Sequence, residues 1–287
     1  MDMTIAVLGG DIRQVRLAQL LLAEGRTVLT WGLEKGGGPN PAPLDQVTEA
    51  EVLILPLPAV RKGQLNLPLT DTVLTPDELW ARLSANQLLL GGAVGDLSRE
   101  LHDRRGLTLL DYADREDFLI DNGVLTAEGA IQRALEETES SLAQSRCLII
   151  GGGRIGKLLC HRLHLLGAEV TAAARSAKDR AWAEAFGCRA VSLDALADAA
   201  EQADILFNTV PAVLLHREIL EKLQPHALIL DLASLPGGVD MEAAERLHRK
   251  VIWLPGLPGK TAPLSAAKAM LRSINDILKE RGYNHEN

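Results

Sequence analysis

The 287-residue sequence lacks the charge pattern of a nucleic-acid-binding protein and the long apolar run of a membrane protein. Its 30 Lys and Arg residues are outnumbered by 38 Asp and Glu, which gives a net charge of −8, and no basic run offsets this balance. The acidic start Met1-Asp2 also lacks the charged and apolar regions of a signal peptide. We therefore expect a cytoplasmic protein without a nucleic-acid partner or a membrane segment.

Cysteine is scarce as well, since the chain has only Cys147, Cys160 and Cys188. No two of them form a C-x-x-C pair, so we expect reduced and mostly buried thiols. His161 and His164 share a helical face near Cys160, but no carboxylate or second cysteine pair completes a set of metal ligands. The sequence therefore predicts no metal site.

The remaining composition is that of a soluble globular protein, with 47% hydrophobic and 24% charged residues, and the length allows two domains. Short apolar segments alternate with helical patterns along the chain, which predicts an α/β fold with two doubly wound, parallel, Rossmann-like sheets. The first domain is expected to contain strands 3–8, 27–31, 51–56, 87–90 and 107–110, and helices 12–24 and 96–105. The second is expected to contain strands 146–150, 169–175, 203–208, 227–232 and 250–254.

Two further helices define how the domains are connected. Thr126 is predicted to be the N-cap of a helix that runs to Ser141 and joins the two domains. The last helix, 265–281, follows a Pro- and Gly-rich link and has an apolar face without a partner nearby in the sequence. We expect this helix to return to the N-terminal domain. The predicted domains are therefore residues 1–122 plus 262–287, for substrate and partner, and residues 123–261, a Rossmann domain that binds NADP.

The most informative motif is the glycine-rich turn that follows strand 146–150. Gly151 permits a tight turn, Gly153 lets a pyrophosphate approach the backbone, and Gly156 lets the next helix pack close to the strand. The N–H groups at the helix start would face the phosphates, with Ile155 in the same turn and Arg154 covering the pyrophosphate. This pattern predicts a dinucleotide site; the alternative is a purely structural glycine turn.

The second strand of this domain ends where the adenosine ribose would lie. NAD sites usually carry Asp or Glu at this point, to accept hydrogen bonds from the ribose hydroxyls. This chain has Arg175 and Ser176 there, with Lys178 close behind. Because a cation and a hydroxyl suit a 2′-phosphate, we predict NADP rather than NAD.

The first strand of the chain is followed by a related turn, Gly9-Gly10-Asp11, which lacks the third glycine. Asp11 would repel a pyrophosphate, so its simplest interpretation is the N-cap of the first helix. The functional alternative adds Arg13, which would lie near the carboxyl ends of the strands and could clamp a carboxylate. The sequence leaves both interpretations open.

Several motifs together resemble one family, the A subunit of dipicolinate synthase from spore-forming bacteria. They occur in the family's order and span almost the whole chain, at 5–14, 151–156, 174–176, 208–211, 231–240 and 255–263. The combination of Gly-Gly-Asp-x-Arg-Gln with Asp-Leu-Ala-Ser-x-Pro-Gly-Gly is the specific part of the resemblance. It implies oxidation of dihydrodipicolinate to dipicolinate with NADP as hydride acceptor. It also implies a flavoprotein partner, the B subunit of dipicolinate synthase, and the cytoplasm of the mother cell of a sporulating bacterium as the setting.

A dicarboxylate substrate requires cations, and we expect Arg13 and Lys260 to bind it, although Lys260 could equally be a solvated surface lysine. The nicotinamide end of the cofactor should lie beside two strand ends. These are the segment Asn208-Thr209-Val210-Pro211, which would also form an ordinary proline-terminated turn, and the residues Ala233 and Ser234.

No acid–base pair stands out, so the catalytic residues stay open and the proton could leave to water. One alternative function is another two-domain NAD(P)-dependent dehydrogenase, such as an amino-acid dehydrogenase. The other is a non-catalytic cofactor-binding subunit that organises the flavoprotein partner. The sequence does not decide whether the chain forms a homo-oligomer.

Overall fold

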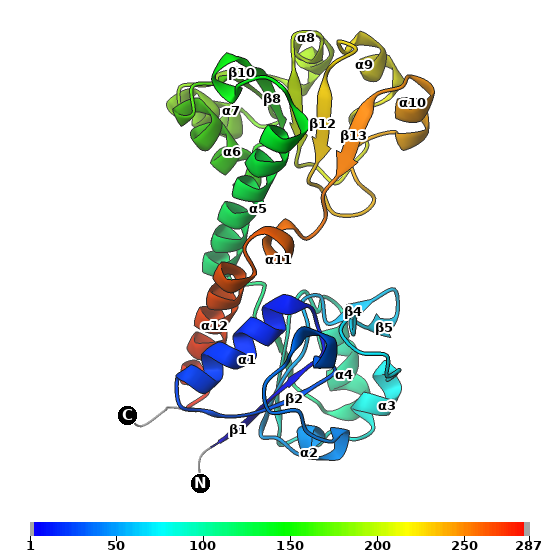
Figure 1. Ribbon diagram of the computed structural model, residues 1–287, viewed down its shortest axis with the longest axis vertical. Helices are drawn as coiled ribbons and strands as arrows, with labels where there is room; N and C mark the ends of the chain where they lie inside the picture. The colour runs from blue at the N-terminus through cyan, green and yellow to red at the C-terminus, as the bar shows by residue number, and fades with distance from the viewer. Residues whose placement is uncertain (1–2, 284–287) are drawn as a thin grey trace. The chain divides into compact units, whose positions relative to one another are not determined.

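In the computed structural model, which describes residues 3–283, the chain folds into two α/β units (Figure 1). Unit 1 comprises Met1–Asn122 and Ala262–Asn287, and unit 2 comprises Gly123–Thr261. Each unit has a parallel sheet with helices on both faces. The predicted α/β class with two doubly wound, Rossmann-like sheets is therefore confirmed.

The sheet of unit 1 consists of β1 Thr4–Leu8, β2 Thr27–Trp31, β3 Val52–Ile54, β6 Leu88–Gly91 and β7 Leu109–Asp111. Its order is β2-β1-β3-β6-β7, and all neighbouring strands are parallel. The chain places β2 on one side of β1 and β3 on the other, so the strand order reverses between β1 and β3. The strands β3 and β6 are buried along their whole length, because helices cover both faces of the sheet.

Helices α1 Ile12–Ala23 and α12 Pro263–Glu280 cover one face of this sheet, and α2 Leu44–Thr48, α3 Pro76–Trp80 and α4 Leu97–Arg105 cover the other. A hairpin of β4 Val60–Arg61 and β5 Gln64–Leu65 and the short 3-10 helix η1 Glu34–Gly36 lie in the connections. The final helix α12 packs along α1 (Figure 1). Its buried face includes Met270, Ile274 and Leu278, so the predicted return of the last helix to the N-terminal unit is confirmed.

The sheet of unit 2 consists of β8 Arg146–Ile150, β9 Glu169–Ala173, β10 Arg189–Val191, β11 Ile205–Asn208, β12 Leu228–Asp231 and β13 Lys250–Trp253. Its order is β10-β9-β8-β11-β12-β13, again with parallel neighbours. This is the order of a dinucleotide-binding Rossmann sheet, which reverses between its first and fourth strands. In unit 2 these strands are β8 and β11.

Helices α6 Arg154–Leu165 and α7 Ala177–Ala185 cover one face of this sheet, together with part of α5 Glu116–Glu137, a helix that contains the boundary between the units. Helices α8 Leu196–Glu201, α9 Arg217–Lys222 and α10 Met241–Arg246 cover the other face. The remaining elements of unit 2 are α11 Leu257–Thr261 and the short 3-10 helices η2 Leu142–Gln144 and η3 Leu193–Ala195.

Two predicted boundaries are wrong. The connecting helix α5 begins at Glu116 rather than at Thr126, and it ends at Glu137 before Ser141. Thr126 is buried inside the helix and is not its N-cap, and the acidic first turn is supplied by Glu116 and Asp117. The link 255–259 is also not a plain loop, because the short helix α11 begins within it.

The three cysteines are buried and unpaired, as expected. Burial raises the pKa of the Cys147 thiol to about 12, so this thiol stays protonated at neutral pH. Within residues 3–283, no three His, Cys, Asp or Glu side chains are placed to hold a metal ion. No helix in the same range has the length and apolarity needed to cross a membrane.

Candidate functional site

The candidate cofactor site starts at the turn 151–153, which joins β8 to α6 at the carboxyl edge of the unit 2 sheet. This turn lies where the strand order reverses, and ligands of open α/β sheets bind at such points. The neighbouring strands fix the turn. Gly151 N donates to Ala173 O at 2.9 Å, and Thr209 donates through both N and Oγ1 to Ile150 O at 2.9 Å.

The glycines of this turn have different physical roles. Gly151 has a φ of +107°, and a Cβ there would lie 2.3 Å from Thr209 Oγ1. A Cβ on Gly156 would lie 2.1 Å from the carbonyl oxygen of Gly151, so the close packing of α6 on the turn requires glycine. Gly153 is different, because a Cβ there would meet no heavy atom within 4 Å. It is the N-cap of α6 and provides no side-chain cap, so the helix start is open to an anion.

In the corresponding turn of unit 1, a carboxylate side chain occupies the start of the following helix. Asp11 is the N-cap of α1: its Oδ1 accepts from Arg13 N at 3.0 Å, and Gln14 Oε1 accepts from Asp11 N at 3.1 Å in a capping box. A Cβ on Gly10 would lie 2.4 Å from Gln14 Cδ. The interpretation of Asp11 as an N-cap is therefore confirmed, and a carboxylate stands where a phosphate would otherwise approach.

Three polar residues follow β9 on the exposed side of unit 2: Arg175, Ser176 and Lys178. Ser176 is the N-cap of α7 and accepts a hydrogen bond from Asp179 N at 3.0 Å. Arg180 Nη1 donates to Arg175 O at 2.8 Å, which holds the backbone of this segment. Cations and a hydroxyl thus gather at the N-terminus of α7, where the helix dipole also favours negative charge.

The sequence reasoning missed two residues of this site, Lys157 and Asp179. They form an ion pair with Nζ and Oδ1 2.9 Å apart, and Ser176 Oγ donates to Asp179 Oδ2 at 2.7 Å. These hydrogen bonds, from Ser176 first and Lys157 second, hold the pKa of Asp179 below its ordinary range. Asp179 also packs on the turn, since a Cβ on Gly152 would lie 2.2 Å from its Cβ. The Ser-x-x-Asp spacing at the helix start was the available signal for Asp179.

At the other end of the site, a buried polar network joins β11 to β12. Asn208 Nδ2 donates to Asp231 Oδ1 at 2.7 Å and to Val210 O at 3.0 Å. Asp231 also accepts from Ala233 N at 3.2 Å and from Gly238 N at 2.9 Å. Asn208 is fully buried, so its amide organises these loops rather than projecting from them.

The residues around this network differ in exposure. Pro211 and Ser234 are exposed, Thr209 and Val210 are half-buried, and Ala233 is buried. The exposed and half-buried residues lie at the carboxyl ends of β11 and β12, the same sheet edge as the glycine turn.

The two predicted substrate residues have very different surroundings. The Arg13 side chain is 9% exposed and is held in bidentate fashion by Asp11, with Nε–Oδ1 at 2.9 Å and Nη2–Oδ2 at 2.8 Å. Its Nη2 also donates to Leu57 O at 2.7 Å, so Arg13 ties the loop after β1 to the loop after β3. Lys260 is an exposed residue of α11.

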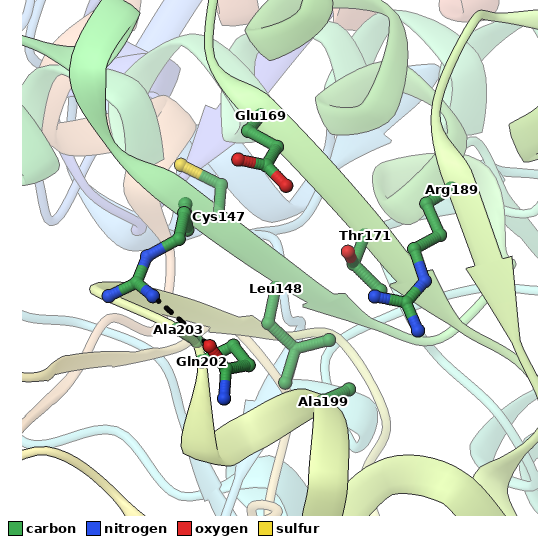
Figure 2. Close-up of a pocket in the computed structure, with 9 residues that line it drawn as sticks. Cys147, Leu148, Glu169, Thr171, Arg189, Ala199, Gln202 and Ala203 are labelled. Atoms are coloured by element: carbon green, nitrogen blue, oxygen red, sulfur yellow. Dashed lines mark hydrogen bonds between the residues drawn. The ribbon is translucent and has the colours of Figure 1, made fainter.

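Unit 2 also contains a pocket of about 240 Å³ (Figure 2). Arg146, Glu169 and Arg189 line it from the amino-terminal starts of β8, β9 and β10. Arg146 Nη1 donates to Gln202 Oε1, another residue of the pocket lining, at 3.3 Å. Because the glycine turn lies at the opposite, carboxyl ends of the strands, this pocket is not part of the candidate cofactor site.

Two family models match separate parts of the chain. Residues 4–113 match the family described as the N-terminal domain of the dipicolinate synthase A subunit. Residues 120–237 match the NAD-binding domain of D-isomer specific 2-hydroxyacid dehydrogenases. The second match supports a nicotinamide cofactor and an NAD(P)-dependent dehydrogenase.

The similarity to individual proteins extends over nearly the whole chain. The dipicolinate synthase A subunit of Bacillus subtilis is 29% identical over 285 residues, which cover 96% of each chain. Its crystal structure gives a TM-score of 0.86 with 27% identity, covering 99% of this chain and 98% of that one. The same subunit from Bacillus halodurans gives 0.87 with 25% identity, covering 96% and 97%. A D-lactate dehydrogenase from Treponema pallidum, 14% identical with a TM-score of 0.62 over 98% and 97% of the chains, shares the fold.

Proposed function

We propose that this chain, which is similar to the dipicolinate synthase A subunit over almost its whole length, oxidises dihydrodipicolinate to dipicolinate with NADP as hydride acceptor. The observation that carries the proposal is the open helix start at Gly153, beside the cations of the β9–α7 segment. A dinucleotide fits these residues, because backbone N–H groups and the dipole of α6 favour phosphate there.

Each part of the cofactor has a proposed set of residues. The turn and the first residues of α6 would hold the pyrophosphate: Gly151, Gly153, Arg154, Ile155 and Gly156. Arg175 and Ser176 would hold the 2′-phosphate, since they stand where NAD sites carry an acid. The ends of β11 and β12 would border the nicotinamide end: Asn208, Thr209, Val210, Pro211, Ala233 and Ser234.

Oxidation of a dihydropyridine ring removes a hydride and a proton and leaves an aromatic ring. Bound NADP supplies the hydride acceptor. The protein then has to bind the substrate and orient it, and aromatisation supplies the driving force. We assign no catalytic acid or base, and the proton passes to water.

For the substrate we propose Arg13 as the main carboxylate contact, with Lys260 as the second candidate. Arg13 lies at the strand-order reversal of unit 1, between the loops after β1 and β3, where ligands of such sheets bind. Its guanidinium is already paired with Asp11, so a substrate carboxylate has to share or displace that partner. Asp11→Asn should therefore lower the KM for the substrate, because Asn still caps α1 but no longer competes as a charge. Arg13→Ala should raise the KM, and neither variant should change NADP affinity.

The proposed partner is the B subunit of dipicolinate synthase, a flavoprotein, and the proposed setting is the cytoplasm of the mother cell of a sporulating bacterium. A second candidate function is a non-catalytic subunit that binds cofactor and organises this partner. We retain this candidate because no catalytic acid or base is assigned. Another two-domain dehydrogenase, such as an amino-acid dehydrogenase, is the third.

One assay separates these functions: dihydrodipicolinate-dependent NADPH formation by the purified chain, alone and with the flavoprotein partner. NADPH formation by the chain alone supports the leading proposal. Cofactor binding by the chain alone, with turnover only when the partner is present, supports the organising role, and turnover of other substrates supports a different dehydrogenase.

Cofactor titration tests the preference for NADP. An Arg–phosphate contact is worth about 1.5–3 kcal/mol, so Arg175→Ala should weaken NADP binding roughly tenfold or more and leave NAD binding almost unchanged. Arg189→Ala is the matched control, because Arg189 is an exposed arginine at the amino-terminal start of β10, at the opposite end of the strands from the glycine turn. Equal weakening of both cofactors, or tighter binding of NAD by the parent protein, would refute the assignment.

A further inference from the structure

We propose that Asp179 sets the balance between NADP and NAD in unit 2, and that it acts from the first turn of α7 rather than from the end of β9. This inference rests on the proposed cofactor function and assigns a specificity residue within that same site. The end of β9 and the start of α7, residues 173–178, contain no Asp or Glu. An acid is nevertheless present beside the phosphate turn, brought there by the packing of α7 on α6.

The contacts of Asp179 place it between the glycine turn and the start of α7. Its Cβ lies 2.2 Å from the position that a Cβ on Gly152 would occupy, and its Oδ2 lies 3.1 Å from that position. Gly152 is the middle residue of the turn that would hold the pyrophosphate. The same carboxylate bonds to Ser176 Oγ at 2.7 Å and to Lys157 Nζ at 2.9 Å. Asp179 thus joins the phosphate turn, the end of the β9 segment and the first turn of α6.

The chemistry of this carboxylate opposes that of Arg175. A carboxylate accepts hydrogen bonds from ribose hydroxyls and repels a 2′-phosphate, which is why NAD sites carry an acid near the second strand. Asp179 also accepts a hydrogen bond from the Ser176 hydroxyl, which therefore donates to a carboxylate rather than to a phosphate. Lys157 offsets part of the charge.

The two charges therefore favour different cofactors. Arg175 and Lys178 favour NADP, and Asp179 favours NAD. The preference of the parent protein for NADP over NAD is the difference between these two effects. Removing the charge of Asp179 should therefore increase that preference.

Asp179→Asn is the direct test, because Asn keeps the shape and the acceptor for the Asp179–Ser176 contact but removes the charge. NADP and NAD dissociation constants would be measured by titration of the full chain, with thermal unfolding as a check on the fold. We expect the ratio of NAD to NADP dissociation constants to rise roughly tenfold, since a charged hydrogen-bond group is exchanged for a neutral one. Asp198→Asn is the matched control: Asp198 forms a similar ion pair with Lys222, at 3.1 Å, away from the glycine turn.

Lys157→Met provides an independent variant if Asp179→Asn unfolds. It leaves the carboxylate without its offsetting cation, so NADP should weaken more than NAD and the ratio should fall. A ratio that stays constant in both variants, while the parent protein binds NADP, overturns this inference alone. Failure of the parent protein to bind either cofactor overturns the proposed function and this inference with it.

Discussion

The substitution Gly153→Ala separates the role of the glycine turn in folding from its role in binding. An added methyl group would meet no heavy atom within 4 Å, and the backbone at Gly153, with φ −73° and ψ −170°, is ordinary for alanine. The cost to folding should be the small one of placing alanine at an N-cap, about 1 kcal/mol or less relative to glycine. Urea unfolding of the variant should therefore closely resemble that of the parent protein.

Binding should respond very differently. A phosphate oxygen must come within hydrogen-bond distance of the N–H groups at the start of α6, and a methyl group at Gly153 stands in that path. Loss of one or two such bonds to a charged group, each worth about 1.5–3 kcal/mol, predicts at least a tenfold weakening. NADP and NAD should weaken alike, because both carry the pyrophosphate. Titration with the reduced forms NADPH and NADH, followed by their fluorescence, measures both constants.

Gly156→Ala is the informative counterpart. Its methyl group would lie 2.1 Å from the carbonyl oxygen of Gly151, so the backbone of the turn or of α6 must move. Overpacking of this kind costs about 1–3 kcal/mol, and stability and binding should fall together. A Gly153→Ala protein that binds both cofactors as the parent does would refute the proposal that phosphate approaches at this residue. A Gly156→Ala protein as stable as the parent would refute the packing argument.

Two further predictions concern the stability of each unit. Ile274→Ala removes a fully buried side chain of α12 and should cost unit 1 about 2–5 kcal/mol, whereas Leu159→Ala in α6 should destabilise unit 2; limited proteolysis with mass spectrometry identifies the unit that opens first. Opening of unit 2 first in Ile274→Ala would contradict the packing of α12. Hydrogen bonds from Arg146 hold the pKa of Asp204 well below its ordinary range. The contribution of ionised Asp204 to folding stability is therefore present above about pH 4 and is lost as the pH falls further. Asp204→Asn should therefore be less stable than the parent at neutral pH and lose less stability on acidification; parallel pH curves of unfolding free energy would refute this.

Local patterns were sufficient to predict the sheets and the glycine turn. The strands β3, β6, β11 and β12 are short apolar runs, and burial on both faces of a parallel sheet requires that composition. The apolar face of α12 likewise indicated a helix that needs a distant partner. Such features depend on residues that are close in the sequence, so they can be predicted without the tertiary arrangement.

Features that depend on packing could not be predicted in the same way. Thr126 has the residue type of an N-cap, but tertiary burial extends α5 through it from Glu116, and burial outweighs a local preference of about 1 kcal/mol. Lys157 and Asp179 come together because α6 packs beside α7; the Ser-x-x-Asp spacing marks Asp179 at a helix start but does not identify Lys157 as its partner. The ion pair between Arg13 and Asp11 could not be predicted either, because the spacing of the two residues does not fix their rotamers.

The comparison of the two units explains why one of two similar turns is the better candidate for a dinucleotide. In both units the first strand is followed by a glycine turn and a helix, and that turn lies at a reversal of strand order. In unit 1 the helix start is satisfied by the carboxylate of Asp11, which also pairs with Arg13. In unit 2 the same position is Gly153, which has no side chain and has open space beside it. A helix start that already holds a negative group gains little from a phosphate, whereas an uncapped one gains charge-assisted hydrogen bonds. The identity of the N-cap residue therefore favours unit 2 for the cofactor and frees the corresponding edge of unit 1 for a different ligand.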